Sequence, residues 1–460
     1  MKKVRAISIV LICLLICMGL TACSSQPTQS SSSSAGSSAS SAASSSSSAA
    51  STSQVVETLV AKALIDPTRD GQSDAATAVA TGANAFAFKL SAALAKDAGN
   101  DNFVCSPYSV WLPLAALLNA TDAEHKDALL AALQAAGISE EDVNLAASRM
   151  LYDLTRQGYK KYSTADFPYY NPLQIANAIF VGNNVTLNKD FAQTFLDYFR
   201  GTAMTVDFSS DEAVKIVNQW ASDNTEGLIT QVVDKFEPET VAAIANAIYF
   251  SDRWSWEFDP DKTEEDVFHS PTGDTTAFYM LREGSSQTYY EDDKVQAMPL
   301  SFETGGGLYI IMPKDGDAQG LLATMTNDYF KQIQRGSYNA EGKLLLPRFS
   351  IESPVMELAD TLEALGVPLF DAEAAPLTGG LIEESIPVFL SRAVHKAVIK
   401  VDEKGTTAAA VTVMMASGTG MPLPSKPFEM ICNKPFIFVL YAHTYDGGSQ
   451  ILFTGIVNQP

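Results

Sequence analysis

One segment near the C-terminal end constrains the fold more than any other part of the chain. Residues 405–421 contain no charged, aromatic or proline side chain, although surface loops are usually rich in polar and turn-forming residues. Residues 397–402 before it alternate in polarity and residues 436–441 after it are continuously apolar, and both patterns predict β-strands. A loop this long is uncommon and often functional. We interpret it as a segment that can itself become a strand, with a flexible connector as the alternative.

The N-terminal end has the pattern of a secretion signal. Residues 1–5 are basic and residues 6–20 are apolar, a stretch too short to span a bilayer comfortably. The following Leu20, Thr21, Ala22 and Cys23 resemble the bacterial lipoprotein box, which predicts a signal peptide over residues 1–22 and lipidation of Cys23. An ordinary signal peptide with a chance cysteine is the alternative. We expect the protein on the extracellular face of a bacterial cell membrane, held there by lipid or released.

The rest of the chain divides into a linker and one large domain. Residues 24–53 are almost entirely Ser and Ala, a composition that buries too little apolar surface to fold and forms a flexible spacer. We therefore assign residues 23–76 to the lipidated cysteine and its linker, and residues 77–460 to a single domain without internal repeats.

Composition excludes several classes of function. The formal net charge of −22 disfavours nucleic acid and anionic lipid surfaces as partners, so the N-terminal lipid is the only membrane contact we expect. Enzyme, nucleotide and zinc motifs are missing from the sequence, and its four histidines are scattered, so we predict no enzyme, no cofactor and no metal site. Cys105 and Cys432 lie in apolar runs and are predicted to be buried free thiols.

Periodicity predicts an α+β fold in which helices pack around a large, mostly antiparallel sheet and smaller sheets. Helical spacing of apolar residues appears first, and strand-like runs follow. The predicted helices cover residues 84–94 and 111–118, and the predicted strands cover residues 175–181, 241–250, 307–312, 344–351, 393–401, 436–441 and 450–457. Asp446, Gly447 and Gly448 should turn the final pair into a hairpin.

Residues 77–460 resemble the serpin family. The matching stretches occur in the family's order and cover residues 102–109, 246–250 with Trp254, 346–350, 393–397, 403–406 and 433–436. The resemblance implies a suicide-substrate inhibitor of serine proteases, whose exposed reactive loop is cleaved and then inserts as a strand into the central sheet. It also implies that the protease is trapped as an acyl-enzyme.

The resemblance assigns roles to individual residues. The hinge of the reactive loop would comprise Glu403, Gly405, Thr406, Ala408 and Ala410. The last four of these residues are small and uncharged, which suits insertion between two strands. The sites that must open, called the shutter and the breach in this family, would comprise Ser106, Ser109, Asn246, Trp254 and His395.

Family spacing places the reactive bond between Thr419 and Gly420, with the neighbouring bonds Gly418–Thr419 and Gly420–Met421 as alternatives. The strand from Gly405 to this bond would hold about fifteen residues and span roughly 50 Å. A small residue at the cut, and the lack of Lys and Arg between Gly405 and Gly420, predict elastase-like or subtilisin-like proteases with small specificity pockets as targets.

Other interpretations stay open. A non-inhibitory serpin could serve as a cell-surface binding or structural protein, and a lipid-anchored hydrolase could use Ser106 with His395. The basic residues Arg156, Lys160 and Lys161 are interpreted as a solvated helix face rather than a polyanion site. We expect a monomer.

Overall fold

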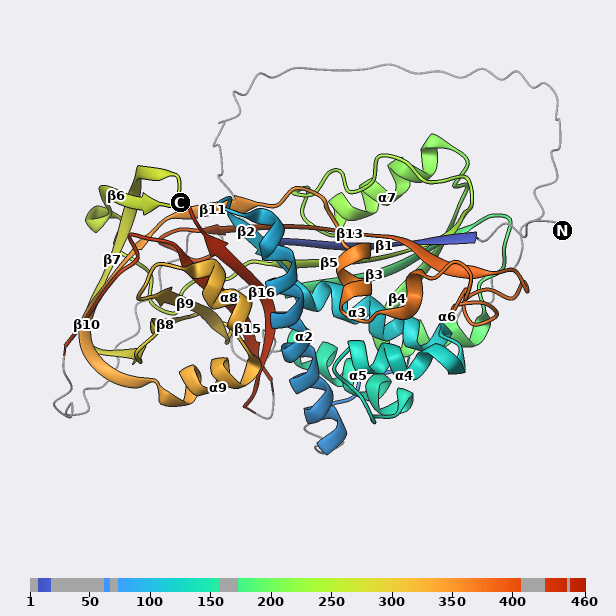
Figure 1. Cartoon of the computed structure of the whole chain (residues 1–460), viewed down its shortest axis with the longest axis horizontal. Coiled ribbons are helices and arrows are strands. Elements are labelled where there is room, and N and C mark those ends of the chain that lie inside the picture. The colour runs from blue at the N-terminus through green and yellow to red at the C-terminus, as the bar shows by residue number, and fades with distance from the viewer. Residues whose placement is uncertain (1–6, 18–61, 67–72, 157–172, 407–426, 445–446) are drawn as a thin grey trace, which may run out of the picture.

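A mixed seven-stranded sheet forms the centre of the molecule (Figure 1). The computed structural model describes residues 7–17, 62–66, 73–156, 173–406, 427–444 and 447–460. Across this sheet the strand order is β11-β13-β1-β5-β3-β4, and β12 also pairs with β13. The strands are β1 (Ile7–Cys17), β3 (Leu173–Gly182), β4 (Gly201–Val206), β5 (Thr240–Phe250), β11 (Phe349–Glu352), β12 (Met356–Glu357) and β13 (Val388–Val401).

A second sheet of nine strands lies at one end of the first (Figure 1). Its order is β14-β10-β7-β8-β9-β15-β16-β2, with β6 paired to β7. The strands are β2 (Phe103–Cys105), β6 (Glu264–Ser270), β7 (Gly273–Glu291), β8 (Val295–Ser301), β9 (Gly307–Pro313), β10 (Tyr338–Pro347), β14 (Phe428–Ile431), β15 (Phe436–His443) and β16 (Ser449–Val457).

Helices cover both faces of the first sheet, so the α+β prediction is confirmed. In Figure 1, α3 to α6 lie on one side of this sheet and α7 lies on the other. The α-helices are α2 (Asp74–Ala98), α3 (Pro107–Leu117), α4 (Ala123–Ala132), α5 (Glu140–Arg156), α6 (Lys189–Phe199), α7 (Asp211–Asp223), α8 (Ala318–Thr324), α9 (Asn327–Gly336) and α10 (Ala359–Ala364). The 3₁₀ turns are η1 (Leu118–Ala120), η3 (Pro260–Lys262) and η4 (Pro368–Phe370).

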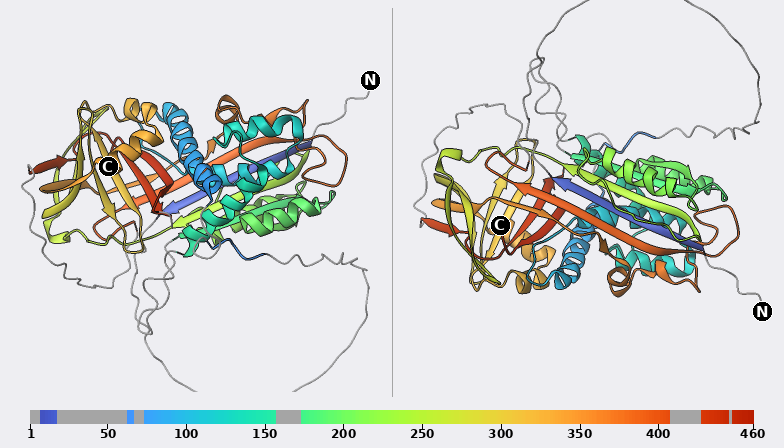
Figure 2. Two further views of the ribbon diagram at one scale, coloured as in Figure 1. Left: turned by 90° about the horizontal axis from the view of Figure 1, so that it is seen from below. Right: turned by 90° about the horizontal axis from the view of Figure 1, so that it is seen from above.

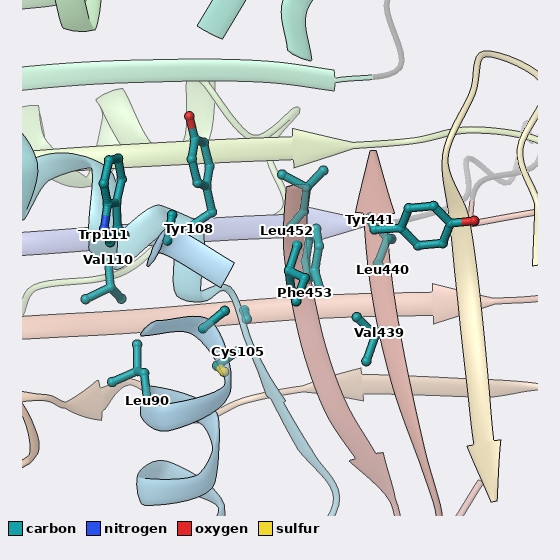
Figure 3. Close-up of a cluster of buried hydrophobic side chains, with 14 of the residues drawn as sticks. Leu90, Cys105, Tyr108, Val110, Trp111, Val439, Leu440, Tyr441, Leu452 and Phe453 are labelled. Carbon is teal, nitrogen blue, oxygen red and sulfur yellow. The ribbon is translucent and has the colours of Figure 1, made fainter. Parts of the chain in front are cut away.

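The main core joins α2 and α3 to the C-terminal strands. Figure 3 shows Leu90 of α2, Trp111 of α3 and Leu440 and Phe453 of β15 and β16, all of which are completely buried. α2 is long and apolar enough to cross a membrane, but Phe86, Leu90 and its other apolar residues pack inside this core. α2 is therefore the central core helix of the domain.

Local sequence explains where α3 begins. Ser106 is its N-cap and accepts a hydrogen bond from the backbone N–H of Ser109 at 3.3 Å, which satisfies one of the free N–H groups at the helix start. Pro107 follows in the first turn, where its missing N–H costs nothing. This cap holds Ser106 and Ser109 beneath the first sheet.

Most of the predicted elements are confirmed. The predicted helices lie within α2, α3 and η1, and six of the seven predicted strands match β3, β5, β9, β13, β15 and β16. The predicted single strand over residues 344–351 is wrong, because the chain divides at Arg348 into β10 and β11, which belong to different sheets. β15 and β16 form the expected antiparallel hairpin from His443 to Ser449, although Asp446 lies outside the described residues.

The predicted signal segment appears in the structure as β1, within the first sheet. β1 lies between β13 and β5 and is parallel to both, with Cys13 opposite His395 on one side and opposite Asn246 on the other. Figure 2 shows β1 in blue beside the orange β13. β1 comes from outside residues 77–460, the predicted domain. The position between β5 and β13 can therefore hold a strand that the predicted domain does not supply in this conformation.

Part of the predicted linker contacts the domain. The backbone N–H of Lys62 donates to Asp197 of α6 at 2.9 Å, and the ammonium of Lys62 lies 3.0 Å from the same carboxylate. The N–H of Ile65 donates to Ser148 of α5 at 3.1 Å. Asp74, the first residue of α2, also lies inside the range 23–76. The division of the chain at residues 22 and 76 stays a prediction.

Candidate functional site

A buried polar chain runs beneath the first sheet where the shutter was predicted. Ser109 of α3 donates a hydrogen bond to Oδ1 of Asn246 in β5, and the amide of Asn246 donates to Oδ1 of Asn177 in β3 at 2.7 Å. The amide of Asn177 then donates to the carbonyl of Phe199, the last residue of α6, at 2.6 Å. This chain ties two strands of the sheet to two helices.

The second half of the predicted shutter joins α3 to β13. The backbone N–H of Ser106 donates to Nε2 of His395 at 2.9 Å. Because a backbone N–H can only donate, Nε2 is the unprotonated nitrogen of this imidazole. The hydroxyl of Ser106 donates elsewhere, to the carbonyl of Leu452 at 2.6 Å. Ser106 and His395 are completely buried.

This geometry does not provide the pair that a hydrolase needs. In a serine hydrolase the nucleophile's hydroxyl donates to the imidazole. Here the Ser106 hydroxyl donates to Leu452, and the imidazole receives the backbone N–H instead. The proposed Ser106–His395 hydrolase therefore has no support.

Trp254 connects the segment after β5 to the predicted hinge. Its indole N–H donates to the carbonyl of Asp402 at 2.9 Å, and its backbone N–H donates to the carbonyl of Lys404 at 2.9 Å. The ring stacks on Phe302 with 4.8 Å between centroids and is 1% exposed. Trp254 therefore holds the turn after β13 against the turn between β8 and β9, and its assignment to the breach stays a prediction.

Gly405 and Thr406 are already paired with the segment that follows β5. Gly405 bridges antiparallel to Arg253, and the N–H of Thr406 donates to the carbonyl of Asp252 at 3.0 Å. Gly405 has φ +152°, and a Cβ atom added to it would lie 2.2 Å from the Asp252 carbonyl oxygen. Only glycine permits this approach.

Glu403 anchors the predicted hinge turn through its carboxylate. Its carboxylate accepts hydrogen bonds from Nε of Arg348 at 2.7 Å and from Oγ1 of Thr263 at 2.6 Å. Burial acts to raise the pKa of Glu403, but the bonds from Arg348 and Thr263 outweigh it and hold that pKa below its usual value. Glu403 is therefore a charged, paired carboxylate at neutral pH.

Several predicted site residues lie outside the described part of the chain. These are the hinge residues Ala408 and Ala410, the reactive-bond residues Thr419 and Gly420, and the lipidation site Cys23. Of the predicted hinge, Glu403, Gly405 and Thr406 are brought together with Trp254.

Three further site residues were missed by the sequence analysis. Asn177 links β3 to Asn246, Arg348 pairs with Glu403, and Asp252 receives Thr406. An asparagine inside the apolar run of residues 175–181 was a usable signal for Asn177. The other two act through contacts with distant segments, which local patterns do not show.

Two other predictions concern thiols and metals. Cys105 and Cys432 are free and buried, as predicted, and burial raises the pKa of Cys105 to about 11. Among the described residues, no group of three or more His, Cys, Asp or Glu side chains is arranged to hold a metal ion.

Comparison with known proteins gives consistent matches. A family model described as "Serpin (serine protease inhibitor)" matches residues 81–460. Mouse (Mus musculus) alpha-1-antitrypsin 1-4 is 29% identical over 401 residues, covering 86% of this chain and 92% of that protein. Alpha-1-antitrypsin of Meriones unguiculatus is 30% identical over 383 residues, covering 82% of this chain and 88% of that protein.

Solved structures share the fold. Tengpin, a thermophilic serpin in its native state, matches with a TM-score of 0.69 and 25% identity, over 87% of this chain and 96% of that one. Human thyroxine-binding globulin matches with a TM-score of 0.70 and 23% identity, over 84% of this chain and 99% of that one.

Proposed function

The chain belongs to the serpin family, and we propose that it inhibits extracellular serine proteases as a suicide substrate. The observation that carries this proposal is the antiparallel pairing of Gly405 and Thr406 with Arg253 and Asp252, just after β5. The chain leaving β13 has already turned back toward the first sheet at this point. Continuation of the same pairing would add the reactive loop to the sheet as a strand.

The topology of the first sheet fits such an addition. β5 and β13 are both parallel to β1 and therefore run in the same direction. A strand that leaves β13 and reverses at Gly405 would be antiparallel to both neighbours, the more stable form of strand pairing. β1 itself, with 11 residues, indicates that the position between β5 and β13 accepts a full strand.

The proposed reaction uses the chemistry of the protease. Its serine attacks the carbonyl of Thr419, the bond to Gly420 breaks, and Gly420 leaves as the new amine terminus. The acyl group stays on the protease as an ester. Insertion of the loop between β5 and β13 would carry the bound protease away and distort its oxyanion hole, so water would no longer release the ester.

The buried polar chain lies at the position where the first sheet would have to open. A strand can enter only if β5 and β13 separate, which changes the hydrogen bonds at Ser109, Asn246 and His395. Buried groups of this kind are costly when unpaired. In the described conformation β1 already separates β5 from β13, and these groups are paired in that expanded sheet, which supports a sheet that accepts an inserted strand at this position.

The target class follows from the loop sequence. Thr419 is small, and no Lys or Arg lies between Gly405 and Gly420, so a protease with a shallow pocket fits better than a trypsin-like enzyme. We place the inhibitor outside a bacterial cell as a monomer, anchored by lipid on Cys23 after loss of residues 1–22. A non-inhibitory serpin that acts as a cell-surface binding or structural protein is the alternative.

A protease panel tests the proposal. The protein would be incubated with elastase-like, subtilisin-like and trypsin-like proteases, separated on denaturing gels, and the released C-terminal fragment weighed by mass spectrometry. We expect a covalent complex with the small-pocket enzymes and a fragment that begins at Gly420. Cleavage without a complex by every protease would instead favour the non-inhibitory alternative.

A further inference from the structure

Arg282 is a half-buried cation that pairs with no carboxylate in the described part of the chain. It lies on β7, and its guanidinium donates a hydrogen bond to the backbone carbonyl of Trp256. Its Nε is buried and has no partner. Because a guanidinium carries five N–H donors, this side chain keeps unused donors where water has little access.

The charge of Arg282 is only partly compensated by its surroundings. The central carbon of the guanidinium lies 4.3 Å from the centre of the Phe258 ring, and the face of an aromatic ring attracts a cation. Burial lowers the pKa of Arg282 to about 10, so the side chain stays charged at neutral pH. A carboxylate that reached it would supply the missing negative charge and accept hydrogen bonds from the unused donors.

An exposed aromatic side chain lies beside this cation. Trp256 is 70% exposed, more than any other large apolar side chain among the described residues. Its carbonyl accepts from Arg282, and Trp254 and Phe258 on either side of it are buried. The backbone at Trp256 is therefore held in place while the indole faces solvent. Tryptophan and arginine are the residue types that contribute most to the affinity of protein interfaces.

The site lies between the two attachment points of the predicted reactive loop. On one side, the N–H of Phe258 donates to the carbonyl of Glu403 at 2.8 Å, just before the loop begins. On the other side, Arg282 is opposite Leu344 of β10, and Leu344 is opposite Met430 of β14, the strand that follows the loop. Two strand spacings amount to about 10 Å. A protease bound to the loop therefore comes close to this site.

The reactive loop cannot neutralise Arg282 itself. Residues 405–426 contain no Asp or Glu. Glu257 and Glu283 are chain neighbours of the site and are exposed, but neither forms an ion pair with Arg282 within the part of the chain that the structure describes. A carboxylate for this cation would therefore come from another molecule.

We propose that Trp256 and Arg282 form a second contact site for the target protease, outside the cleft that receives the reactive loop. The indole packs against apolar surface of the protease, and the guanidinium pairs with a carboxylate on that surface. This contact adds affinity and selectivity to a loop whose residues 405–421 are uncharged. The inference rests on the proposed function, but it concerns how the protease docks and not how it is trapped.

Binding of a subtilisin-like protease whose catalytic serine is replaced by alanine tests the site. Such a protease binds the loop without forming an acyl-enzyme, so the dissociation constant measured by calorimetry with the full chain reports docking alone. Arg282→Gln keeps a donor for the Trp256 carbonyl and removes the charge, and we expect it to weaken binding about ten-fold at low salt. This loss should become smaller at high salt, because salt screens the charge pair.

Two further variants make the result decisive. Trp256→Ala removes an exposed side chain, and we expect it to weaken binding by about ten-fold as well. Arg335→Gln removes the same charge from an exposed position at the end of α9 and should bind like the parent.

Unchanged binding in Arg282→Gln or in Trp256→Ala would overturn the proposal, as would an equal loss in Arg335→Gln. Loss of binding to a sulfated polysaccharide in Arg282→Gln, with protease binding unchanged, would also overturn it and would assign the site to that ligand. Cleavage by the active protease without a covalent complex would contradict the proposed inhibition and leave the docking result intact.

Discussion

The backbone N–H of Ser106 donates to Nε2 of His395 over 2.9 Å, and both residues are completely buried. His395→Ala removes this acceptor and leaves a buried N–H at the start of α3 unsatisfied. We expect a loss of about 1–3 kcal/mol in the free energy of unfolding, measured by urea denaturation. His443→Ala, at an exposed position, is the control and should change stability by no more than about 0.5 kcal/mol. Equal effects of the two substitutions would contradict the role of His395.

Thr406 should tolerate only small hydroxyl side chains. It is 1% exposed, and its hydroxyl accepts the N–H of Asp252 at 3.2 Å. Thr406→Arg would place a charge where the loop begins to insert, so we expect the variant to be cleaved by a target protease without forming a covalent complex. Thr406→Ser keeps the hydroxyl and should still form the complex, as seen on a denaturing gel. Equal complex yields for Thr406→Arg and the parent would count against loop insertion from this hinge.

The Glu403–Arg348 pair should make stability depend on pH. The folded-state pKa of Glu403 is lowered, so its contribution is present above the usual glutamate value and disappears as pH falls through the lowered value. Glu403→Gln should therefore cost about 1–3 kcal/mol at neutral pH and progressively less below about pH 4. Denaturation of both proteins across this range measures the difference. A constant difference at every pH would show that the charge of Glu403 is not involved.

Removal of residues 1–22 should increase the yield of covalent protease complex, because it removes β1 from the first sheet. β1 (Ile7–Cys17) lies between β5 and β13, where the reactive loop is proposed to insert. A chain that keeps these residues should form less covalent complex than a chain that starts at Cys23, because the position is filled. Complex yields at equal protease ratios compare the two chains. Identical yields would mean that β1 does not compete with the loop.

Local patterns in the sequence predicted a helix or strand well where one face of the element, or its whole length, was uniformly apolar. β5 consists entirely of buried residues, and its apolar run matched the structure almost residue for residue. Residues 344–351 were predicted as one strand although Pro347, Arg348 and Ser350 interrupt their apolar run, and the chain crosses between sheets at Arg348. At the crossing Arg348 contacts Glu403, which is far away in the sequence and which no local pattern shows.

The functional site could be predicted only in part, for a similar reason. Ser109, Asn246 and His395 lie on α3, β5 and β13, and only the family resemblance grouped them. Asp252 was missed because nothing in its neighbourhood marks it as buried. Its environment is created by Thr304 and Thr406, which the fold brings from other segments.

The most direct test of the account is the stability of the protein before and after cleavage of its reactive loop. A chain starting at Cys23 would be cut within residues 407–426 by a protease that is not trapped, and the melting temperature of both forms measured. Insertion of the loop between β5 and β13 adds a row of backbone hydrogen bonds on each side, so we predict a rise of more than about 10 °C. An unchanged or lower melting temperature would contradict insertion, and with it the proposed inhibition.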